Sequence, residues 1–308
     1  MGANELVDIA VANAPFLLPA LGFTVVWLVV RVVFYAGLRA YFKSLPATSR
    51  LKVVALQEKV LEESFAIVGA LVATWLGYQA FQYSDAGSCG FLNQTACFSG
   101  WPGSVGPRAQ AITTFHTVEL GWYLHYLAKH HMGIGMVDNL QMALHHFSTI
   151  TLLLMSFLLN LHRAGVLVLF LLNLSNPFLH VAKVTHYVEA KADKMCFVLF
   201  ALAFFLSRIV AYPLVVLKGT LFDSFRAEPS FLDPRRYLAV YLTANGLLLL
   251  LMGMQIQWFM GIIRLVRQAV GGSHEDFKKE GKVHDYAKTQ HEGQTGAAGA
   301  GAGGKKDE

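Results

Sequence analysis

Two adjacent histidines, His145 and His146, stand inside an apolar stretch that is long enough to cross a membrane. Ionisable side chains are costly inside a bilayer, so those that occur there usually mark a functional site. An imidazole can accept a proton near neutral pH, and it can also take an acyl group as a nucleophile. We therefore predict His145 and His146 as catalytic residues of acid–base or acyl-transfer chemistry. The alternative is that they only hydrogen-bond to neighbouring helices, as polar residues of membrane bundles often do.

The apolar segment before the histidines carries a stripe of polar residues at spacings of three, four and three: His116, Glu119, Tyr123 and Tyr126. Residues three or four apart lie on the same face of a helix. We predict that His116, Glu119 and Tyr123 bind substrate as one wall of a pocket. We expect no metal there, because adjacent histidines point in different directions from a helix and no thiolates complete a coordination sphere.

After the histidines, another helical face collects polar residues: Asn173, Asn176, His180 and Lys183. The connection 161–164 is short enough to make the two segments antiparallel neighbours. Antiparallel pairing brings His180 level with His145 and Asn176 level with Thr149. We therefore expect the polar faces to converge in the cytosolic half of the membrane, provided that the helices are rotated towards one another.

The composition defines the class of protein in which these residues must be placed. Of 308 residues, 55% are hydrophobic and only 15% are charged, whereas about 25% is usual for soluble domains. A membrane-crossing helix needs about 20 mostly apolar residues. Seven candidate spans follow from the sequence: 15–38, 65–82, 110–128, 141–160, 165–186, 195–217 and 237–263. The sequence thus predicts an all-α, polytopic transmembrane bundle of about seven spans.

Changes in composition along the chain suggest three parts. Residues 1–64 are expected to form an N-terminal transmembrane anchor with a cytosolic linker, in which 43–64 could also be an interfacial helix, and residues 65–271 the main transmembrane domain. Residues 272–308 are polar and end in a Gly/Ala-rich run that cannot form a core, which predicts a flexible cytosolic tail. The net charge of +5 follows from the membrane topology, so we expect no nucleic-acid partner.

Three features predict the orientation of the chain. Asn93 begins an Asn-Gln-Thr glycosylation acceptor, and Cys89 and Cys97 flank it as candidates for a disulfide in an oxidising lumen. The alternative is a chance acceptor and two free thiols. Lys305 and Lys306 resemble the dilysine retrieval signal of endoplasmic-reticulum membrane proteins, which is read on the cytosolic side. With seven spans, the N-terminus is lumenal and the C-terminus cytosolic, and lysine and arginine concentrate on the cytosolic side.

Several of these motifs in their order along the chain resemble the signature region of the TLC-domain family, most closely that of ceramide synthases. The matching segments are 144–150, 160–165, 173–176, 182–183, 187, 194–196, 208, 212–213 and 220–222. The resemblance implies an acyl-CoA-dependent N-acyltransferase that acts on a sphingoid base, with acyl-CoA as co-substrate and without a bound cofactor. It also implies membrane lipids as partners, and it allows a homo- or heterodimer.

The resemblance implies roles for individual residues. His145 accepts the acyl group or a proton with His146 beside it, while Asn173 and Asn176 position them. Substrate-binding roles are implied for Arg163, His180 and Lys183, and four cytosolic lysines are expected to meet the phosphates of acyl-CoA: Lys129, Lys183, Lys191 and Lys194.

The sequence departs from the ceramide synthase pattern at two positions, because those enzymes carry Asp where Asn173 and Asn176 stand. An asparagine can orient an imidazole but cannot balance the charge of an imidazolium; in a protease triad such an exchange costs about 10⁴ in turnover. The alternative function is therefore a non-catalytic TLC-domain protein that binds or regulates membrane lipids. An accessory role in translocation is a third alternative.

Overall fold

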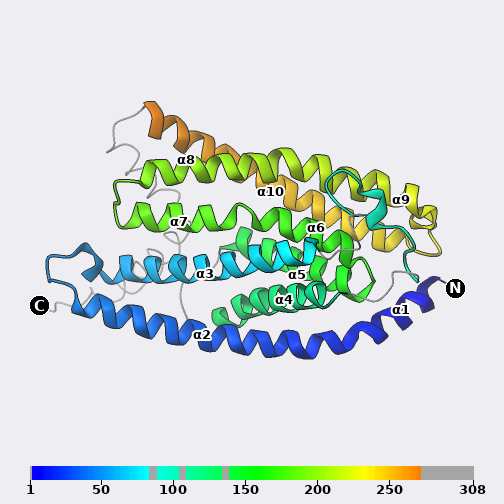
Figure 1. The fold of residues 1–308 in the computed structure, drawn as a ribbon, viewed down its shortest axis with the longest axis horizontal. Coiled ribbons are helices and arrows are strands. Elements are labelled where there is room, and N and C mark those ends of the chain that lie inside the picture. The colour runs from blue at the N-terminus through cyan, green and yellow to red at the C-terminus, as the bar shows by residue number, and fades with distance from the viewer. Residues whose placement is uncertain (1, 83–88, 104–108, 134–138, 272–308) are drawn as a thin grey trace, which may run out of the picture.

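The computed structural model describes residues 2–82, 89–103, 109–133 and 139–271, which form a bundle of long helices lying side by side (Figure 1). The helices of the bundle are α1 (Gly2–Asn13), α2 (Leu17–Ser44), α3 (Val54–Gln82), α4 (Gln110–His131), α5 (Leu140–Leu158), α6 (His162–Asn173), α7 (Asn176–Tyr187), α8 (Asp193–Phe204), the π-helices η5 (Phe205–Leu217) and η6 (Gly219–Asp223), α9 (Ser224–Ala227) and α10 (Leu238–Gly271). Short 3-10 turns complete the described chain: η1 (Ala14–Phe16), η2 (Arg50–Lys52), η4 (Thr95–Cys97) and η7 (Pro229–Leu232).

Six helical segments of the described chain are long and apolar enough to cross a membrane: 4–44, 54–82, 140–158, 162–187, 193–227 and 238–267. Large apolar side chains also point outwards, among them Leu18, Val33, Trp75 and Leu214, each more than 60% exposed. Such a surface is suited to lipid rather than to water. The prediction of an all-α transmembrane bundle is confirmed.

Helix α4 is a further long helix, and its 22 residues are enough to cross the apolar core of a bilayer. Its composition is more polar than that of the six apolar segments. It packs against α2, α3 and α5 and buries Phe115, His116 and Glu119, so its neighbours cover much of its polar stripe. The start of α1 and the end of α10 lie at opposite ends of the bundle (Figure 1).

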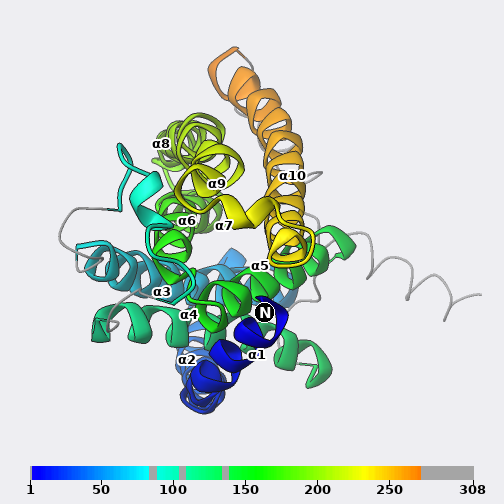
Figure 2. The ribbon, with the colours of Figure 1, turned by 90° about the vertical axis from the view of Figure 1, so that its right-hand side faces the viewer.

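Small residues allow α2, α3 and α4 to approach one another closely, as in many membrane bundles. A Cβ atom on Gly121 of α4 would lie 2.7 Å from the Cβ of Phe23 on α2. A Cβ atom on Gly69 of α3 would lie inside the ring of Trp122. Viewed end-on, α2 lies outside α3 and α4, on the opposite side of the bundle from α8 and α10 (Figure 2).

The helical hairpin partner of α5 is broken into α6 and α7. Pro177 has no N–H group, so it cannot donate to the carbonyl four residues earlier, that of Asn173. The hydroxyl of Thr74 on α3 donates to this carbonyl instead, at 3.3 Å. The break also leaves the Leu172 carbonyl available to a side chain from another helix.

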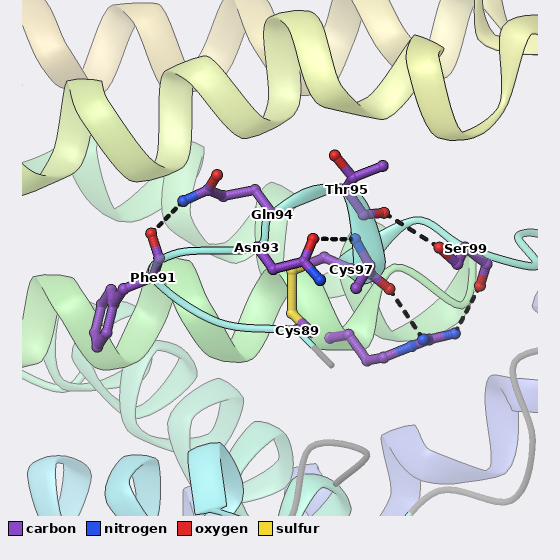
Figure 3. The surroundings of a disulfide bond; sticks show 9 residues. Cys89, Phe91, Asn93, Gln94, Thr95, Cys97 and Ser99 are labelled. Carbon is purple, nitrogen blue, oxygen red and sulfur yellow. Dashed lines mark hydrogen bonds between the residues drawn. A yellow bond between two sulfur atoms is a disulfide. The ribbon is translucent and has the colours of Figure 1, made fainter. Parts of the chain in front are cut away.

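A disulfide between Cys89 and Cys97 closes a loop in which Asn93 and Gln94 lie between the two cysteines (Figure 3). Arg163 at the start of α6 donates to the carbonyls of Ala96 and Ser99, at 3.1 and 2.9 Å. Arg163 thus anchors the loop to the α5–α6 turn, and substrate binding by this residue stays a prediction. Asn93 is exposed on the loop, and its glycosylation also stays a prediction.

Helix α3 begins at Val54, so residues 54–64 of the segment expected as a linker or an interfacial helix are helical. The polar residues of segment 54–64 are typical of a linker, but Glu62 is buried in the helix. The predicted tail and the retrieval signal at Lys305 and Lys306 lie outside the described residues.

Candidate functional site

The paired histidines lie near the start of α5, whose first turn is capped by the side chain of Asn139, an acceptor from the Met142 N–H at 2.9 Å. Both imidazoles are half-buried among aromatic rings. The ring of Tyr123 on α4 lies 6.5 Å from that of His145 and 5.7 Å from that of His146, between centroids. Tyr123 is thus an aromatic neighbour of both histidines.

Each histidine has an aromatic neighbour of its own. The ring of Tyr126 stacks on that of His146 at 5.3 Å with an angle of 21° between the planes. The ring of Trp258 on α10 meets that of His145 edge-on at 5.5 Å. The two imidazoles are 5.5 Å apart, so they can share one reacting group only if it lies between them.

Tyr123 lies where the histidines meet the other polar groups of the bundle. Its hydroxyl is close enough to Thr149 for a hydrogen bond and to Glu119 and Arg208 for electrostatic interaction. The Thr149 hydroxyl in turn donates to the His145 carbonyl at 2.9 Å. One phenol therefore connects the imidazoles on α5 with the polar residues at the α6–α7 break.

Arg208 on η5 reaches into that break and is only 7% exposed. Its guanidinium donates to the Ser175 hydroxyl at 2.9 Å, to the Leu172 carbonyl at 2.7 Å and to the Asn176 side-chain oxygen at 2.6 Å. All three acceptors are neutral oxygens. The backbone carbonyl is available because α6 ends before Pro177, so the proline creates part of the binding position for the arginine.

Asn173 and Asn176 are joined by a 3.0 Å hydrogen bond from the Asn176 amide to the Asn173 side-chain oxygen. Glu119 of α4 lies near the side chain of Asn173 and is 2% exposed. We call Asn173, Asn176 and Arg208 the asparagine cluster. Glu119 places a carboxylate beside this cluster, near the positions where ceramide synthases carry aspartates.

An apolar cavity begins at Thr149, one helical turn from His145, and lies between α5, α6, α10 and the η6–α9 segment. Its lining is mostly aliphatic and aromatic: Phe98, Thr149, Leu152, Leu153, Met155, Ser156, Leu161, Ala164, Gly165, Val168, Leu169, Leu172, Thr220, Ser224, Phe231, Val240, Tyr241, Ala244, Asn245, Leu248 and Leu251. Binding sites are commonly apolar hollows with a few placed polar groups. This cavity is suited to an apolar chain.

His180 and Lys183 both bind Glu63 of α3. The His180 Nδ1 donates to one carboxylate oxygen at 2.6 Å, and the Lys183 Nζ donates to the other at 2.8 Å. Helix α7 packs on α3 and α8 after the break at Pro177, and this packing brings His180 to Glu63; that His180 lies level with His145 stays a prediction. Glu63 was not expected at the site, because it was placed in the linker.

His116 sits deeper along α4, away from the start of α5. Its Nδ1 lies 3.0 Å from the Ile112 carbonyl and its Nε2 lies 3.0 Å from the Ser156 hydroxyl. A carbonyl only accepts, so Nδ1 carries the proton and Nε2 accepts from the serine. A Cβ on Gly165 would lie 2.9 Å from this Nε2. His116 therefore joins α4 to the α5–α6 hairpin, and a role in substrate binding stays a prediction.

A buried ion cluster, which we define as Arg31, Glu62 and Lys129, was not predicted. Arg31 donates to both carboxylate oxygens of Glu62 at 3.1 and 2.9 Å, and Lys129 binds the same carboxylate. Arg31 is fully buried and Lys129 is 1% exposed, so the expectation that Lys129 meets phosphates of acyl-CoA is wrong. A charge inside an apolar span marks a candidate site, and Arg31 in the first span was such a signal.

The groups around the histidines are of the types that acyl transfer uses. A half-buried imidazole can attack a carbonyl carbon or accept a proton, and the Tyr123 phenol is a donor close by. Among the residues that the structure describes, no group of three His, Cys, Asp or Glu side chains is arranged to hold a metal ion.

Comparisons with known proteins show the family of the chain. Residues 59–264 match the family model described as the TLC domain. Human ceramide synthase 1 is 29% identical over 213 residues, which cover 65% of this chain and 58% of the relative. Human ceramide synthase 5 is 29% identical over 183 residues, with 58% and 44% covered. The ceramide synthase LOH1 of Arabidopsis thaliana is 30% identical over 145 residues, with 46% of each covered. The chain thus spans about half the length of the curated relatives it matches.

Proposed function

Because this chain belongs to the TLC-domain family, we propose that it is an acyltransferase that joins the acyl group of an acyl-CoA to the amine of a sphingoid base. The observation that carries the proposal is the position of His145, one helical turn from the apolar cavity that begins at Thr149. A chain bound in that cavity would present its reactive end to an imidazole. The similarity to ceramide synthases supports the choice of acyl-CoA and sphingoid base as substrates.

In the proposed reaction an imidazole nitrogen of His145 attacks the thioester carbonyl carbon of acyl-CoA. The carbon–sulfur bond breaks, and the coenzyme A thiolate leaves as a thiol after taking the N–H proton of the acyl-imidazolium. The amine of the sphingoid base then attacks the acyl carbon, the bond between this carbon and the imidazole nitrogen breaks, and the proton lost by the amine returns to His145 as the amide forms. The Tyr123 hydroxyl is placed to donate to the carbonyl oxygen while negative charge develops on it.

Glu119 takes the charge-balancing role that Asn173 and Asn176 cannot provide. An imidazolium or acyl-imidazolium in a buried site needs a nearby anion, because an isolated charge is costly there. Glu119 shares a helical face with Tyr123, and Tyr123 contacts both histidines. Asn173 and Asn176 then position Glu119 and Arg208 rather than the imidazoles themselves.

We propose that the protein works in the endoplasmic-reticulum membrane with the Cys89–Cys97 loop and the N-terminus in the lumen. The disulfide and the exposed Asn93 support this orientation, because both belong to an oxidising, glycosylating compartment. An endoglycosidase-sensitive mass in cells that Asn93→Gln abolishes is the expected result. A wild-type chain of unmodified mass, with the loop protected from added protease only in inside-out vesicles, would contradict it.

The proposal is tested by incubating the purified full chain with a sphingoid base and a panel of acyl-CoAs. We expect N-acylated product from the wild type and a loss of about 10³ or more with His145→Ala, since a covalent catalyst is removed. His131→Ala is the matched control, because it removes an exposed imidazole at the end of α4 and should leave turnover unchanged. Equal product from wild type and His145→Ala would overturn the proposal.

A second function, lipid binding without turnover, is favoured by one observation. The side-chain oxygen of Asn176 accepts from Arg208, so a position that is acidic in ceramide synthases is neutral here and engaged in structure. In the same assay this function predicts no product at any chain length, together with saturable stabilisation of the fold by a single-chain lipid. Narrowing the cavity with Ala244→Phe should remove that stabilisation, whereas a change at the exposed Leu242 should not.

A further inference from the structure

The ion cluster reaches the paired histidines through the ring of Tyr126. The Arg31 guanidinium carbon lies 5.1 Å from the centroid of this ring, and the Lys129 Nζ lies 4.6 Å from it. The same ring stacks on His146 at 5.3 Å. Cations within about 6 Å of an aromatic ring are attracted to its face. The Tyr126 ring therefore contacts both the two cations of the ion cluster and the imidazole of His146.

Arg31 is fixed in place from several sides. Beyond its two bonds to Glu62, it meets the Tyr35 hydroxyl at 2.9 Å and the Nε2 of His125 at 3.1 Å. A guanidinium only donates, so this Nε2 is unprotonated, and His125 carries its proton on Nδ1, which faces the Trp122 carbonyl. His125 is thus neutral and adds no charge to the cluster.

Helix α2, which carries Arg31 and Tyr35, lies outside residues 59–264 that match the TLC-domain family model. We infer that this helix completes the site: Arg31, through Tyr126, is a positioning residue for the imidazole of His146. The ion cluster orients the Tyr126 ring, and the ring limits the rotation of the imidazole beside it. The inference about the contact stands without the proposed function, whereas its importance for turnover rests on that function.

The competing explanation is that the ion cluster only joins α2 to α3 and α4. Under that explanation, changes in the cluster alter the stability of the fold but leave His146 as it is. The two explanations therefore differ in the behaviour of one side chain, which can be measured directly in a protein that stays folded.

The test compares the chemical reactivity of the two neighbouring histidines in the full chain in detergent. Diethyl pyrocarbonate modifies neutral imidazoles, and fragment mass spectrometry separates His146 from His145, which serves as the internal reference. Tyr126→Leu removes the ring but leaves the charges, and we expect the His146:His145 modification ratio to rise about threefold or more, the factor that a lost aromatic contact corresponds to. Tyr126→Phe keeps the ring, and the wild-type ratio is expected.

Arg31→Met tests the other end of the chain of contacts. It leaves Glu62 paired with Lys129, so the buried carboxylate keeps a cation and the fold should survive. We expect the His146:His145 ratio to rise as in Tyr126→Leu, with partial rescue by Arg31→Lys. If Arg31→Met does not fold, Tyr126→Leu decides the question alone. A ratio unchanged from wild type in every folded variant would overturn the inference.

Turnover gives the second measurement. If the proposed acyltransfer is observed, Tyr126→Leu should lower kcat about tenfold with little change in KM, because a misoriented imidazole impairs the reaction more than binding. If the wild type shows no acyltransfer, the proposed function fails, yet the modification ratio still decides the positioning role.

Discussion

The ion cluster and the asparagine cluster solve the same problem, a buried arginine, in different ways. Arg31 is paired with the carboxylate of Glu62, which Lys129 also binds. Arg208 is held by three neutral oxygens, two of them from side chains and one from the backbone. Both arginines are less than 10% exposed.

The difference shows where this bundle places its negative charge. A carboxylate that pairs with two cations is committed to structure, since removing it leaves buried charge unbalanced. Where amides replace carboxylates, Arg208 keeps its hydrogen bonds. A carboxylate nearby is then not used to pair with the arginine. Glu119 is that carboxylate, beside Asn173 and on the helical face that reaches the histidines.

The largest effect should come from breaking the ion cluster at its anion. Glu62→Gln leaves Arg31 and Lys129 buried without a carboxylate between them, and we expect a loss of about 3–5 kcal/mol in folding stability. Glu58→Gln, one turn earlier on α3, breaks the exposed pair with Arg39 and should cost less than about 1 kcal/mol. Thermal unfolding of both variants in detergent measures the contrast. Similar losses for the two would contradict it.

Restoring aspartate in the asparagine cluster should act in opposite directions at the two positions. Asn176→Asp brings a carboxylate to Arg208, which is already desolvated, and should stabilise the fold by about 1 kcal/mol. Asn173→Asp places a second carboxylate beside Glu119 and should destabilise it by about 2 kcal/mol, because like charges in a buried site repel.

The double variant Asn173→Asp/Glu119→Gln is the control for that pair of changes. It keeps the new aspartate and removes the neighbouring carboxylate, so most of the lost stability should return. Unfolding temperatures in one detergent at one pH compare the wild type, the two aspartate variants, Glu119→Gln and the double variant. Equal effects of Asn173→Asp with and without Glu119 would show that charge repulsion is not the cause.

An effect smaller than that of Asn173→Asp is expected from the loss of a single acceptor of Arg208. Ser175→Ala removes one of three hydrogen bonds to the guanidinium and should cost about 1.5 kcal/mol. Thr185→Ala on α7 removes a hydroxyl that donates to carbonyls of its own helix and should cost less than about 0.5 kcal/mol. If Ser175→Ala matches the threonine control, the neutral oxygens contribute little to holding Arg208.

The helical bundle could be predicted because apolar stretches of the right length leave few alternatives to membrane spans. The start of α3 could not, since Glu62 looks like part of a polar linker until Arg31 and Lys129 appear as its partners. The π-helical segment η5 also escaped prediction, because no periodicity distinguishes it from an α-helix over so few residues.

At the site, spacing correctly grouped Glu119 and Tyr123 on one face of a helix, and the structure brings Tyr123 to the histidines. The partner of His180 could not be predicted in this way. The hairpin argument considered only the two segments that the turn joins, whereas α7 also packs on α3, where Glu63 binds His180. Sequence periodicity describes a helix face, and it carries no information on which neighbour that face meets after a break.

The break at Pro177 also bears on how this chain can diverge chemically from its relatives. Part of what holds Arg208 is the Leu172 carbonyl, a backbone atom that any side chain at that position supplies. Replacing an aspartate at position 176 with asparagine therefore changes the charge of the pocket, while Arg208 keeps its bond to the Leu172 carbonyl. The helix break at Pro177 thus allows the charge beside Arg208 to change while the fold around the arginine is retained.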